Sequence, residues 1–449
     1  TTIPKGECRD YPKYEVRGFM LDVGRRPFES ETLQEVAKTM LWYKMNDLQL
    51  HLNDNYIFLE NYSTSEGAMS AYEGFRMESD VKEGGLNQAD LTSDDMYYTK
   101  AEMKSMIQNY RKLGLDIIPE FDTPAHSLSF TKVRPDLRFG TTGRQNDHFN
   151  LSTKYDESLA FIESIWDEYI KGDDPVFDKD TTVHIGTDEF HGNGGNEYFR
   201  SFSDSMIQYI QGTGRDVRMW GSLSNKNGKT PVASKDVQLN IWNTGYANPK
   251  NMYDLGYDLI NTLEGSLYIV PSAGYYSDYL NSQNLYNNWV PNNFSGTVLR
   301  AGDKQVLGGT YAIWNDQIDT RGNGITEYDD FDRFFQPLPS LSEKMWGEGT
   351  DRTYSEMRAV AEKVDTAPNT NPYYEADSVG NDVIDYSFDD EKVYDESGNN
   401  NDSVSEKNVE EVAGKSGNAL KLNGGESYVE TPVDMVGPTS GKTAGSSIS

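Results

Sequence analysis

The 449-residue sequence predicts a (β/α)8 barrel, known as a TIM barrel, followed by a small, incomplete all-β segment. Between about Tyr14 and Glu348, short apolar runs alternate with longer amphipathic stretches, which is the rhythm of repeated β/α units. Polar or aromatic residues stand at the end of each apolar run or just after it. After Gly347 this rhythm stops and the composition changes. One large barrel and one smaller unit therefore account for the length.

Eight apolar runs are predicted to be the barrel strands. They are Arg17–Val23, Asp47–Leu52, Asp116–Phe121, Thr182–Gly186, Asp216–Trp220, Val237–Trp242, Asp258–Thr262 and Val306–Trp314. The stretches between them are predicted to contain the helices. One helix over 30–43 opens with Ser30, and another over 99–113 is capped by Thr99 and ended by Gly114.

Two connections, 56–94 and 265–302, are longer than most loops of compact domains. The first is rich in Gly, Ser, Glu and Tyr, and the second is rich in aromatic residues. We expect each to form a wall or a lid of a site at the carboxyl ends of the strands. Surface excursions without fixed structure are the alternative.

The domain boundaries follow from the change in composition. We assign the catalytic barrel to 1–365, a linker to 366–382, and a partial β-sandwich with a flexible tail to 383–449. The last segment alternates short strands with turn residues. It resembles the opening strands of concanavalin/laminin-G-like jelly rolls, whose presence implies either glycan adhesion or a spacer.

Charge and composition exclude several classes of partner. The chain carries 72 acidic and 41 basic residues, a formal net charge of -31. Such a field repels phosphate backbones and anionic membrane surfaces, so we expect no nucleic-acid partner. No apolar run approaches ~18 residues, so no membrane span is predicted. The sole cysteine, Cys8, excludes an internal disulfide and a cysteine-based zinc site within one chain.

The most informative motif is the pair of adjacent carboxylates Asp188 and Glu189. They close the apolar run that begins at Val183, and glycine-rich chain follows them. Catalytic groups of β/α barrels stand at the carboxyl ends of the strands. A solvated pair in a turn is the alternative reading of this motif taken alone.

The other strand ends repeat this pattern. In order they read Arg17-Gly-Phe-Met-Leu-Asp22, His51-Leu-Asn-Asp54, Pro119-Glu-Phe-Asp-Thr-Pro-Ala-His126, His184-Ile-Gly-Thr-Asp188-Glu189, Met219-Trp220, Ile241-Trp242, Tyr268 and Trp314-Asn-Asp316. This series resembles glycoside hydrolase family 20, which contains the β-N-acetylhexosaminidases and the lacto-N-biosidases. The resemblance covers about Arg9 to Gly347.

The resemblance implies a retaining hydrolase in which the acetamido group of the substrate attacks the anomeric carbon and forms an oxazolinium. Most retaining glycosidases use two carboxyl groups ~5 Å apart, one of them as the nucleophile, and enzymes in which the substrate's own amide attacks are an exception. Two adjacent carboxylates suit this exception. Glu189 would protonate the leaving oxygen, and Asp188 would bind the acetamido N–H. Tyr268 would bind the acetamido carbonyl oxygen. His126 would contact Glu189 and would itself be oriented by Asp54.

The resemblance also implies the sugar-binding residues. Trp220, Trp242 and Trp314 would stack on the sugar and surround its acetamido methyl group. Arg17 would bind O3 and O4 through its planar fork of donors. Asp316 stands where the family more often has Glu, and Val270 stands where it commonly has Asp. Both departures make room for a bulkier glycan.

The expected activity is removal of terminal β-linked N-acetylglucosamine or N-acetylgalactosamine from glycans, such as milk-oligosaccharide or mucin chains. A lacto-N-biosidase, which releases galactosyl-β1,3-N-acetylglucosamine, is one alternative. A non-catalytic glycan-binding protein is another. The expected partner is an oligosaccharide or a glycoconjugate glycan, with neither metal nor organic cofactor. The resemblance implies an extracellular or cell-surface location in a bacterium.

Overall fold

The computed structural model describes residues 6–7, 9–81, 90–140, 143–191, 195–318, 324–347, 352–372, 378–389, 393–415 and 417–433. Cys8 and the predicted tail from Gly437 lie outside these residues. The chain forms two compact units, 1–368 and 369–449, each of which is described by itself.

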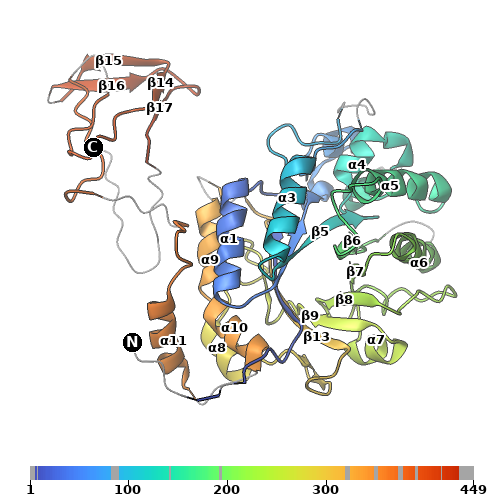
Figure 1. Ribbon diagram of the computed structural model, residues 1–449. Coiled ribbons are helices and arrows are strands. Elements are labelled where there is room, and N and C mark those ends of the chain that lie inside the picture. The colour runs from blue at the N-terminus through green and yellow to red at the C-terminus, as the bar shows by residue number, and fades with distance from the viewer. Residues whose placement is uncertain are drawn as a thin grey trace. The chain divides into compact units, whose positions relative to one another are not determined.

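The first unit contains a closed barrel of parallel strands, as predicted (Figure 1). In order around the barrel they are β1 (Val16–Asp22), β2 (Asp47–His51), β5 (Asp116–Thr123), β6 (Val183–Gly186), β7 (Val217–Trp220), β8 (Val237–Ile241), β9 (Asp258–Asn261) and β13 (Val306–Ile313). The barrel closes because β13 pairs with β1, with Tyr311 opposite Phe19. All eight predicted strands are confirmed to within two residues at either end.

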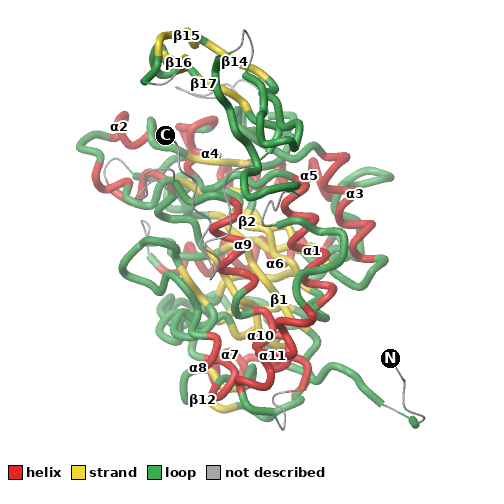
Figure 2. The backbone as a smooth tube through the Cα atoms, turned by 90° about the vertical axis from the view of Figure 1, so that its left-hand side faces the viewer, coloured by secondary structure: helices red, strands yellow, loops and turns green. Residues whose placement is uncertain are grey.

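Helices surround the barrel, as Figures 1 and 2 show. They include α1 (Ser30–Trp42), α3 (Lys100–Arg111), α5 (Tyr155–Ile170), α6 (Asn196–Gly212), α7 (Pro249–Leu255), α9 (Glu327–Phe335), α10 (Leu338–Gly347) and α11 (Tyr354–Val364). Helix α3 begins with a capping box, in which Thr99 and Glu102 each accept a backbone N–H of the other. It is followed by Gly114 at φ +92°, a conformation that favours glycine. Helix α1 begins at Ser30 as predicted, but no side chain caps it.

The connection 56–94 is structured over its described residues. It contains η1 (Leu59–Asn61), α2 (Ser65–Met69) and β4 (Glu73–Phe75), and β4 pairs with β3 (Asn53–Asn55). Leu59, Met69 and Ala71 pack on Leu128, which begins α4 (Leu128–Val133). The short helices η2 (Pro135–Leu137) and η3 (Gly143–Asp147) follow α4. The apolar contacts fix this connection above the carboxyl end of β2.

The connection 265–302 is also structured. It contains β10 (Tyr268–Ile269), α8 (Ser282–Asn288), β11 (Asn293–Phe294) and β12 (Thr297–Val298). Strand β10 pairs with β13 beside the barrel, with Tyr268 opposite Ala312. Trp289, at the end of α8, packs against Gly309 of β13, where any larger residue would meet the indole ring. The connection is thereby held against the barrel wall.

Four short strands lie among the described residues of the second unit. They are β14 (Ser405–Lys407), β15 (Val409–Ala413), β16 (Asn418–Leu422) and β17 (Tyr428–Glu430), which form the antiparallel pairs β14–β17 and β15–β16. Most of their side chains are at least partly exposed. No helix within the described part of the chain is both long enough and apolar enough to span a membrane.

A buried ion pair crosses the interior at the amino ends of the strands. Arg218 of β7 donates through both terminal nitrogens to the two carboxylate oxygens of Asp47 on β2, at 2.8 and 2.7 Å. Both side chains are buried. The pair links opposite sides of the barrel below the region where the site lies.

Replacing Asp47 by Ala should lower the free energy of unfolding by ~3–5 kcal/mol, because Arg218 would keep a buried charge without its partner. Urea denaturation followed by tryptophan fluorescence measures this loss. The matched control is Asp116→Ala, which removes a more exposed carboxylate at the start of β5 and should cost less than ~1 kcal/mol. Equal losses in the two variants would contradict the assignment.

Candidate active site

The structure brings most of the predicted site residues to the carboxyl ends of the barrel strands. These residues are Asp54, His126, Asp188, Glu189, Trp220, Trp242, Tyr268, Trp314 and Asp316. Some end a strand, others follow one directly, and Tyr268 lies on β10 beside β13. Arg17 is the exception.

The Asp188–Glu189 pair stands on a sharp turn after β6. Gly186 and Thr187 have φ values of +74° and +70°, and Glu189 has +34°. Gly186 also lies so close to Asp122 that an added Cβ would come within 2.1 Å of its Oδ1. Only glycine fits there, and the two non-glycine residues hold strained backbone that is typical of functional sites. The backbone N–H of Glu189 donates to Asp188 Oδ1 at 2.9 Å.

Asp188 lies in an environment that disfavours its charged form. Burial and the negative charges of Glu189 and Asp122 raise its pKa well above the ordinary value. Burial also raises the pKa of Asp122 to about 7. Neither carboxylate oxygen of Asp122 has a hydrogen-bond partner among the described residues. Asp122 was not among the predicted site residues, although it lies four residues before His126 at the end of β5.

His126 connects Asp54 to Glu189. Its Nδ1 lies 3.0 Å from Asp54 Oδ1, and its Nε2 lies 3.8 Å from Glu189 Oε2. Burial opposes the charged imidazolium, but the charge and the hydrogen bond of Asp54 raise the pKa of His126 well above the ordinary value. The raised pKa favours an imidazolium, whose Nδ1–H would donate to Asp54. Its second N–H faces Glu189 across a distance that is longer than a hydrogen bond.

Asp54 also binds two further cations. Its Oδ2 lies 2.9 Å from Arg25 and 2.7 Å from His51 Nε2. Burial acts to raise the pKa of Asp54, but the charges of Arg25 and His126 hold that pKa far below the ordinary range. Asp54 is thus a permanent carboxylate at the centre of the site.

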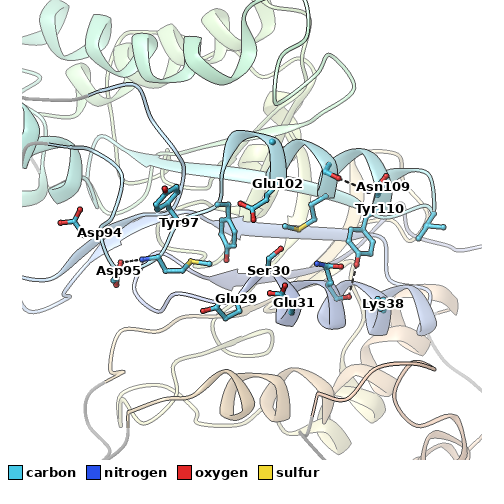
Figure 3. Close-up of a pocket in the computed structure, with 17 residues that line it drawn as sticks. Glu29, Ser30, Glu31, Lys38, Asp94, Asp95, Tyr97, Glu102, Asn109 and Tyr110 are labelled. Carbon is cyan, nitrogen blue, oxygen red and sulfur yellow. Dashed lines mark hydrogen bonds between the residues drawn. The ribbon is translucent and has the colours of Figure 1, made fainter. Parts of the chain in front are cut away.

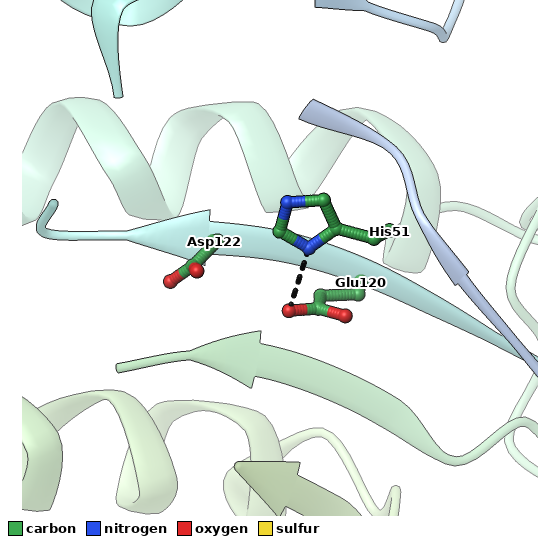
Figure 4. Close-up of side chains that lie close together, drawn as sticks. All are labelled: His51, Glu120 and Asp122. Atoms are coloured by element: carbon green, nitrogen blue, oxygen red, sulfur yellow. Dashed lines mark ion pairs between the residues drawn. The ribbon is translucent and has the colours of Figure 1, made fainter. Parts of the chain in front are cut away.

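His51, Glu120 and Asp122 lie close enough to resemble a metal site (Figure 4). However, His51 Nδ1 lies 2.9 Å from Glu120 while its Nε2 faces Asp54. Burial disfavours a charge on His51, yet these two carboxylates raise its pKa well above the ordinary value. An imidazolium has no free lone pair for a metal ion. A protonated His51 between two carboxylates therefore accounts for this cluster better than a metal ion does.

The aromatic residues form a cluster beside the carboxylates. Trp220, Trp242, Trp314 and Tyr268 pack together, with Val270 also in contact. The ring centroids of Trp314 lie 5.5 Å from Trp220 and 5.8 Å from Tyr268. Trp220 is fully buried and donates to Glu120. Trp220 therefore forms the floor of the cluster.

Arg17 lies at the other end of the barrel, in contrast to the prediction. It is the second residue of β1, so it stands at the amino end. Its guanidinium donates to the backbone oxygens of Lys44, Tyr14 and Glu15 and lies 5.3 Å from the Trp346 ring. The predicted residue lies at the start of β1, whereas the chain reaches the site only beyond Asp22, at the other end of this strand.

Arg25 is the arginine at the site. It is 3% exposed, and its terminal nitrogens lie 2.9 Å from Asp22, 2.9 Å from Asp54 and 3.2 Å from Asp316. Its guanidinium carbon lies 5.9 Å from the Trp314 ring. The Asp22-x-x-Arg25 spacing directly after the first strand is the sequence signal by which Arg25 could have been found.

Both long connections contribute to the surroundings of Arg25 and Asp316. A cavity of about 240 Å³ is lined by Arg25, Tyr56, Tyr72, Asn315, Asp316 and Ile318. The hydroxyl group of Tyr275 donates to Asp316 at 2.8 Å. The first connection therefore provides one wall and the second provides another.

A larger cavity, of about 1020 Å³, lies away from these residues, between α1, α3 and the segment 94–98 (Figure 3). Its lining includes Glu29, Glu31 and Asp94 but none of the residues at the strand ends. Glu102, which also lines it, is part of the capping box of α3. The chemistry of the strand ends is therefore separate from this groove.

Comparison with known proteins assigns the fold and the family. Residues 14–348 match the family model described as "Glycosyl hydrolase family 20, catalytic domain". The chain is 25% identical over 394 residues to a lacto-N-biosidase of Bifidobacterium bifidum, which covers 81% of this chain and 31% of that protein. It is 26% identical over 390 residues to the β-hexosaminidase subunit beta of Entamoeba histolytica, covering 78% and 62%. The chain therefore spans less than two thirds of either relative.

Solved structures agree with the barrel. A β-N-acetylhexosaminidase from Bacteroides fragilis aligns with a TM-score of 0.59 at 20% identity, covering 79% of this chain and 70% of that one. Dispersin B aligns with a TM-score of 0.52 at 18% identity, covering 74% and 100%. These likenesses concern the fold, whereas the family model covers most of the chain. With that match, the chain belongs to glycosyl hydrolase family 20.

Proposed function

We propose that the protein is a retaining β-N-acetylhexosaminidase that removes terminal β-linked N-acetylglucosamine or N-acetylgalactosamine from glycans. The observation that carries this proposal is the Asp188–Glu189 pair, with Glu189 facing the imidazolium of His126 and the aromatic cluster alongside. The substrate's own acetamido oxygen acts as the nucleophile, so no second protein nucleophile is needed.

Glu189 serves as the proton donor and then as the base. When the acetamido oxygen attacks C1, the bond from C1 to the leaving oxygen breaks and Glu189 gives that oxygen its proton. The resulting oxazolinium is opened by water, which gives a proton back to Glu189. The His126 N–H, 3.8 Å from Glu189, stabilises the carboxylate that forms between these two steps.

Asp188 stabilises the charge that develops on the acetamido group. Its raised pKa means that the free site disfavours the carboxylate. An acetamido N–H that gains positive charge favours this carboxylate, and the gain is larger in the transition state than in the bound substrate. Asp122 is buried beside Asp188 and contributes to the raised pKa of Asp188. Burial raises the pKa of Asp122 itself as well.

The aromatic cluster and Arg25 hold the sugar. Trp242 and Trp314 have indole N–H groups without partners among the described residues, and both rings belong to the cluster with Tyr268. These rings provide the apolar surface for the pyranose and the acetamido methyl group. Arg25 and Asp316 provide the donor and the acceptor for sugar hydroxyls, the role that was first assigned to Arg17.

A lacto-N-biosidase is the second candidate, and the 240 Å³ cavity beside Arg25 and Asp316 favours it. A galactose unit on O3 of the bound sugar needs space where the hydroxyl groups meet Arg25. Tyr56 and Tyr72, which line this cavity, supply aromatic surface for a second sugar ring. Action outside the cell stays a prediction, as does glycan adhesion by the C-terminal β unit.

A panel of three aryl glycosides tests the function. We expect hydrolysis of p-nitrophenyl N-acetyl-β-glucosaminide and a rate for p-nitrophenyl β-glucoside that is ~1000-fold lower or less, because the glucoside has no acetamido oxygen to attack C1. Comparable rates for these two would contradict substrate assistance. Preferential hydrolysis of the p-nitrophenyl lacto-N-bioside would instead favour the second candidate.

Glu189→Gln should lower kcat/KM for a methylumbelliferyl N-acetyl-β-glucosaminide by ~100-fold or more, through loss of the proton donor. With a 2,4-dinitrophenyl leaving group the loss should be much smaller, because that oxygen leaves without a proton. The exposed Glu31, replaced in the same way, is the control. Equal losses with both leaving groups would remove Glu189 from the acid role.

The two arginines should respond differently to replacement by lysine. Arg25→Lys keeps the charge but loses the planar fork, so kcat/KM should fall by ~100-fold. Arg17→Lys should lower the unfolding midpoint and leave kcat/KM within ~2-fold, because it loses only bonds to backbone oxygens at the opposite end. Steady-state kinetics and thermal unfolding distinguish them. A larger kinetic loss for Arg17→Lys would restore the first assignment.

A further inference from the structure

A second cavity lies beside the proposed catalytic centre, beyond the carboxyl ends of β8 and β9. Its volume is about 370 Å³. Asn243 and Glu264 line it from the barrel side, and Asn284, Asn288 and Trp289 line it from the end of α8. We name this space the amide cavity.

Glu264 forms the wall between the amide cavity and the catalytic centre. One of its carboxylate oxygens accepts from Asn243 at 2.6 Å, and the other accepts from the hydroxyl group of Tyr276. The ring of Tyr276 lies 4.9 Å from that of Tyr268, and the backbone N–H of Glu264 donates to Trp242. Glu264, which lines the amide cavity, is therefore hydrogen-bonded both to Tyr276 and to Trp242 of the aromatic cluster.

Three amide groups in this cavity are fixed through one atom and present the other. Asn284 Oδ1 accepts from Asn288 Nδ2 at 2.7 Å, and Asn293 Oδ1 accepts from the N–H of Gly296 at 3.0 Å. The opposite atoms, Nδ2 of Asn284, Oδ1 of Asn288 and Nδ2 of Asn293, make no hydrogen bond to another described residue, and the side chains of Asn284 and Asn288 are exposed. The cavity thus presents donors and an acceptor in orientations that the protein already holds, which lowers the entropic cost of binding.

Trp289 adds an aromatic surface to the cavity, and its indole N–H is buried. The side chain lines the cavity and is 7% exposed. Its Nε1 has no hydrogen-bond partner within the described part of the chain. A buried indole N–H of this kind normally finds a partner.

The lining defines the chemistry of the ligand. Among its residues, Glu264 is the single charged one, and both of its oxygens are in use. Without a lysine or an arginine the cavity cannot balance an anion, and with one engaged carboxylate it does not form a cation site. Fixed amides and an indole ring match a ligand with many neutral hydroxyl or amide groups. That chemistry is that of an uncharged sugar.

We propose that the amide cavity is a second sugar-binding site, which holds a neutral sugar residue of the same glycan whose terminal N-acetylhexosamine lies at Asp188 and Glu189. This inference rests on the proposed function. It makes the protein selective for extended or branched neutral glycans over short ones. Glycans whose corresponding residue is sialylated or sulfated gain nothing from the site, because the chain carries a net charge of -31 and the cavity has no cation.

The decisive experiment compares two double variants of the same helix. Asn284→Ala with Asn288→Ala removes two amides of the cavity, whereas Gln283→Ala with Asn287→Ala removes two exposed amides of α8 that do not line it. Alanine favours helix at all four positions, so both variants should fold. Kinetics are measured with p-nitrophenyl N-acetyl-β-glucosaminide and with neutral tetrasaccharides that end in β-linked N-acetylglucosamine.

For Asn284→Ala with Asn288→Ala, kcat/KM on the tetrasaccharides should fall about 10-fold, the size expected for two lost neutral hydrogen bonds. The aryl glycoside should be hydrolysed within ~2-fold of the parent rate, since it does not reach the cavity. The control variant should match the parent on both. An unchanged tetrasaccharide rate, or equal losses on both substrates, would overturn the proposal.

A binding measurement separates this proposal from the proposed function. With a thiazoline inhibitor saturating the catalytic centre, saturation-transfer NMR with a neutral tetrasaccharide should give a signal for the parent and the control. That signal should be lost in Asn284→Ala with Asn288→Ala. No signal from the parent would overturn the second site, whereas a missing aryl activity with an intact signal would overturn only the catalytic assignment.

Discussion

The carboxylate of Asp54 is the constraint on which the rest of the site depends. It is buried and lies within 3.0 Å of three cationic groups, on Arg25, His51 and His126. Each partner extends the network in another direction: Arg25 to Asp316, His51 to Glu120, and His126 to Glu189. Loss of Asp54 would leave the buried His126 without its hydrogen-bonded carboxylate, whereas Arg25 would keep Asp22 and Asp316 and His51 would keep Glu120. Breaking a buried ion pair by removing one partner costs ~3–5 kcal/mol. The same carboxylate therefore sets both the stability of the barrel mouth and the positions of the reacting groups.

Barrel closure explains why residues so far apart in sequence share this network. Because β13 pairs with β1, the chain after β13 lies directly beside the chain after β1. The backbone N–H of Asn315 donates to the carboxylate of Asp22 at 3.0 Å, and its side-chain amide donates to the backbone oxygen of Asp22 at 2.9 Å. Asp316 directly follows Asn315, and Arg25 lies three residues after Asp22. The ion pair between them is thus a consequence of the last strand closing on the first.

Much of the fold could be predicted from the sequence, whereas the side-chain arrangement could be predicted only in part. Strand β1 carries the apolar run Phe19-Met20-Leu21, which ends at the polar Asp22, and a pattern of this kind locates a strand and its carboxyl end. The direction of β1 decides which of two nearby arginines reaches the site, because Arg17 lies at its amino end and Arg25 follows its carboxyl end. The prediction of Arg17 did not take this direction into account. Asp122 lies within the Pro119–His126 motif, but its placement beside Asp188 could not be predicted, because it depends on the close approach of Gly186 from another strand. The amide cavity is assembled from three separate segments, so no local pattern marks it.

The distribution of protons among the buried groups gives this arrangement its chemical sense. The pKa values of His51 and His126 are raised, which favours their charged forms, and the pKa values of Asp188 and Asp122 are raised, which favours their neutral forms. The cations lie on the Asp54 side, and the carboxyl groups that resist ionisation lie after β6 and at the end of β5. A reaction that forms a cation next to Asp188 relieves this imbalance, because the new positive charge stabilises the carboxylate that burial disfavours. An anionic intermediate would increase it. The electrostatics therefore favour chemistry in which the sugar becomes positively charged, and they oppose chemistry in which it becomes negative.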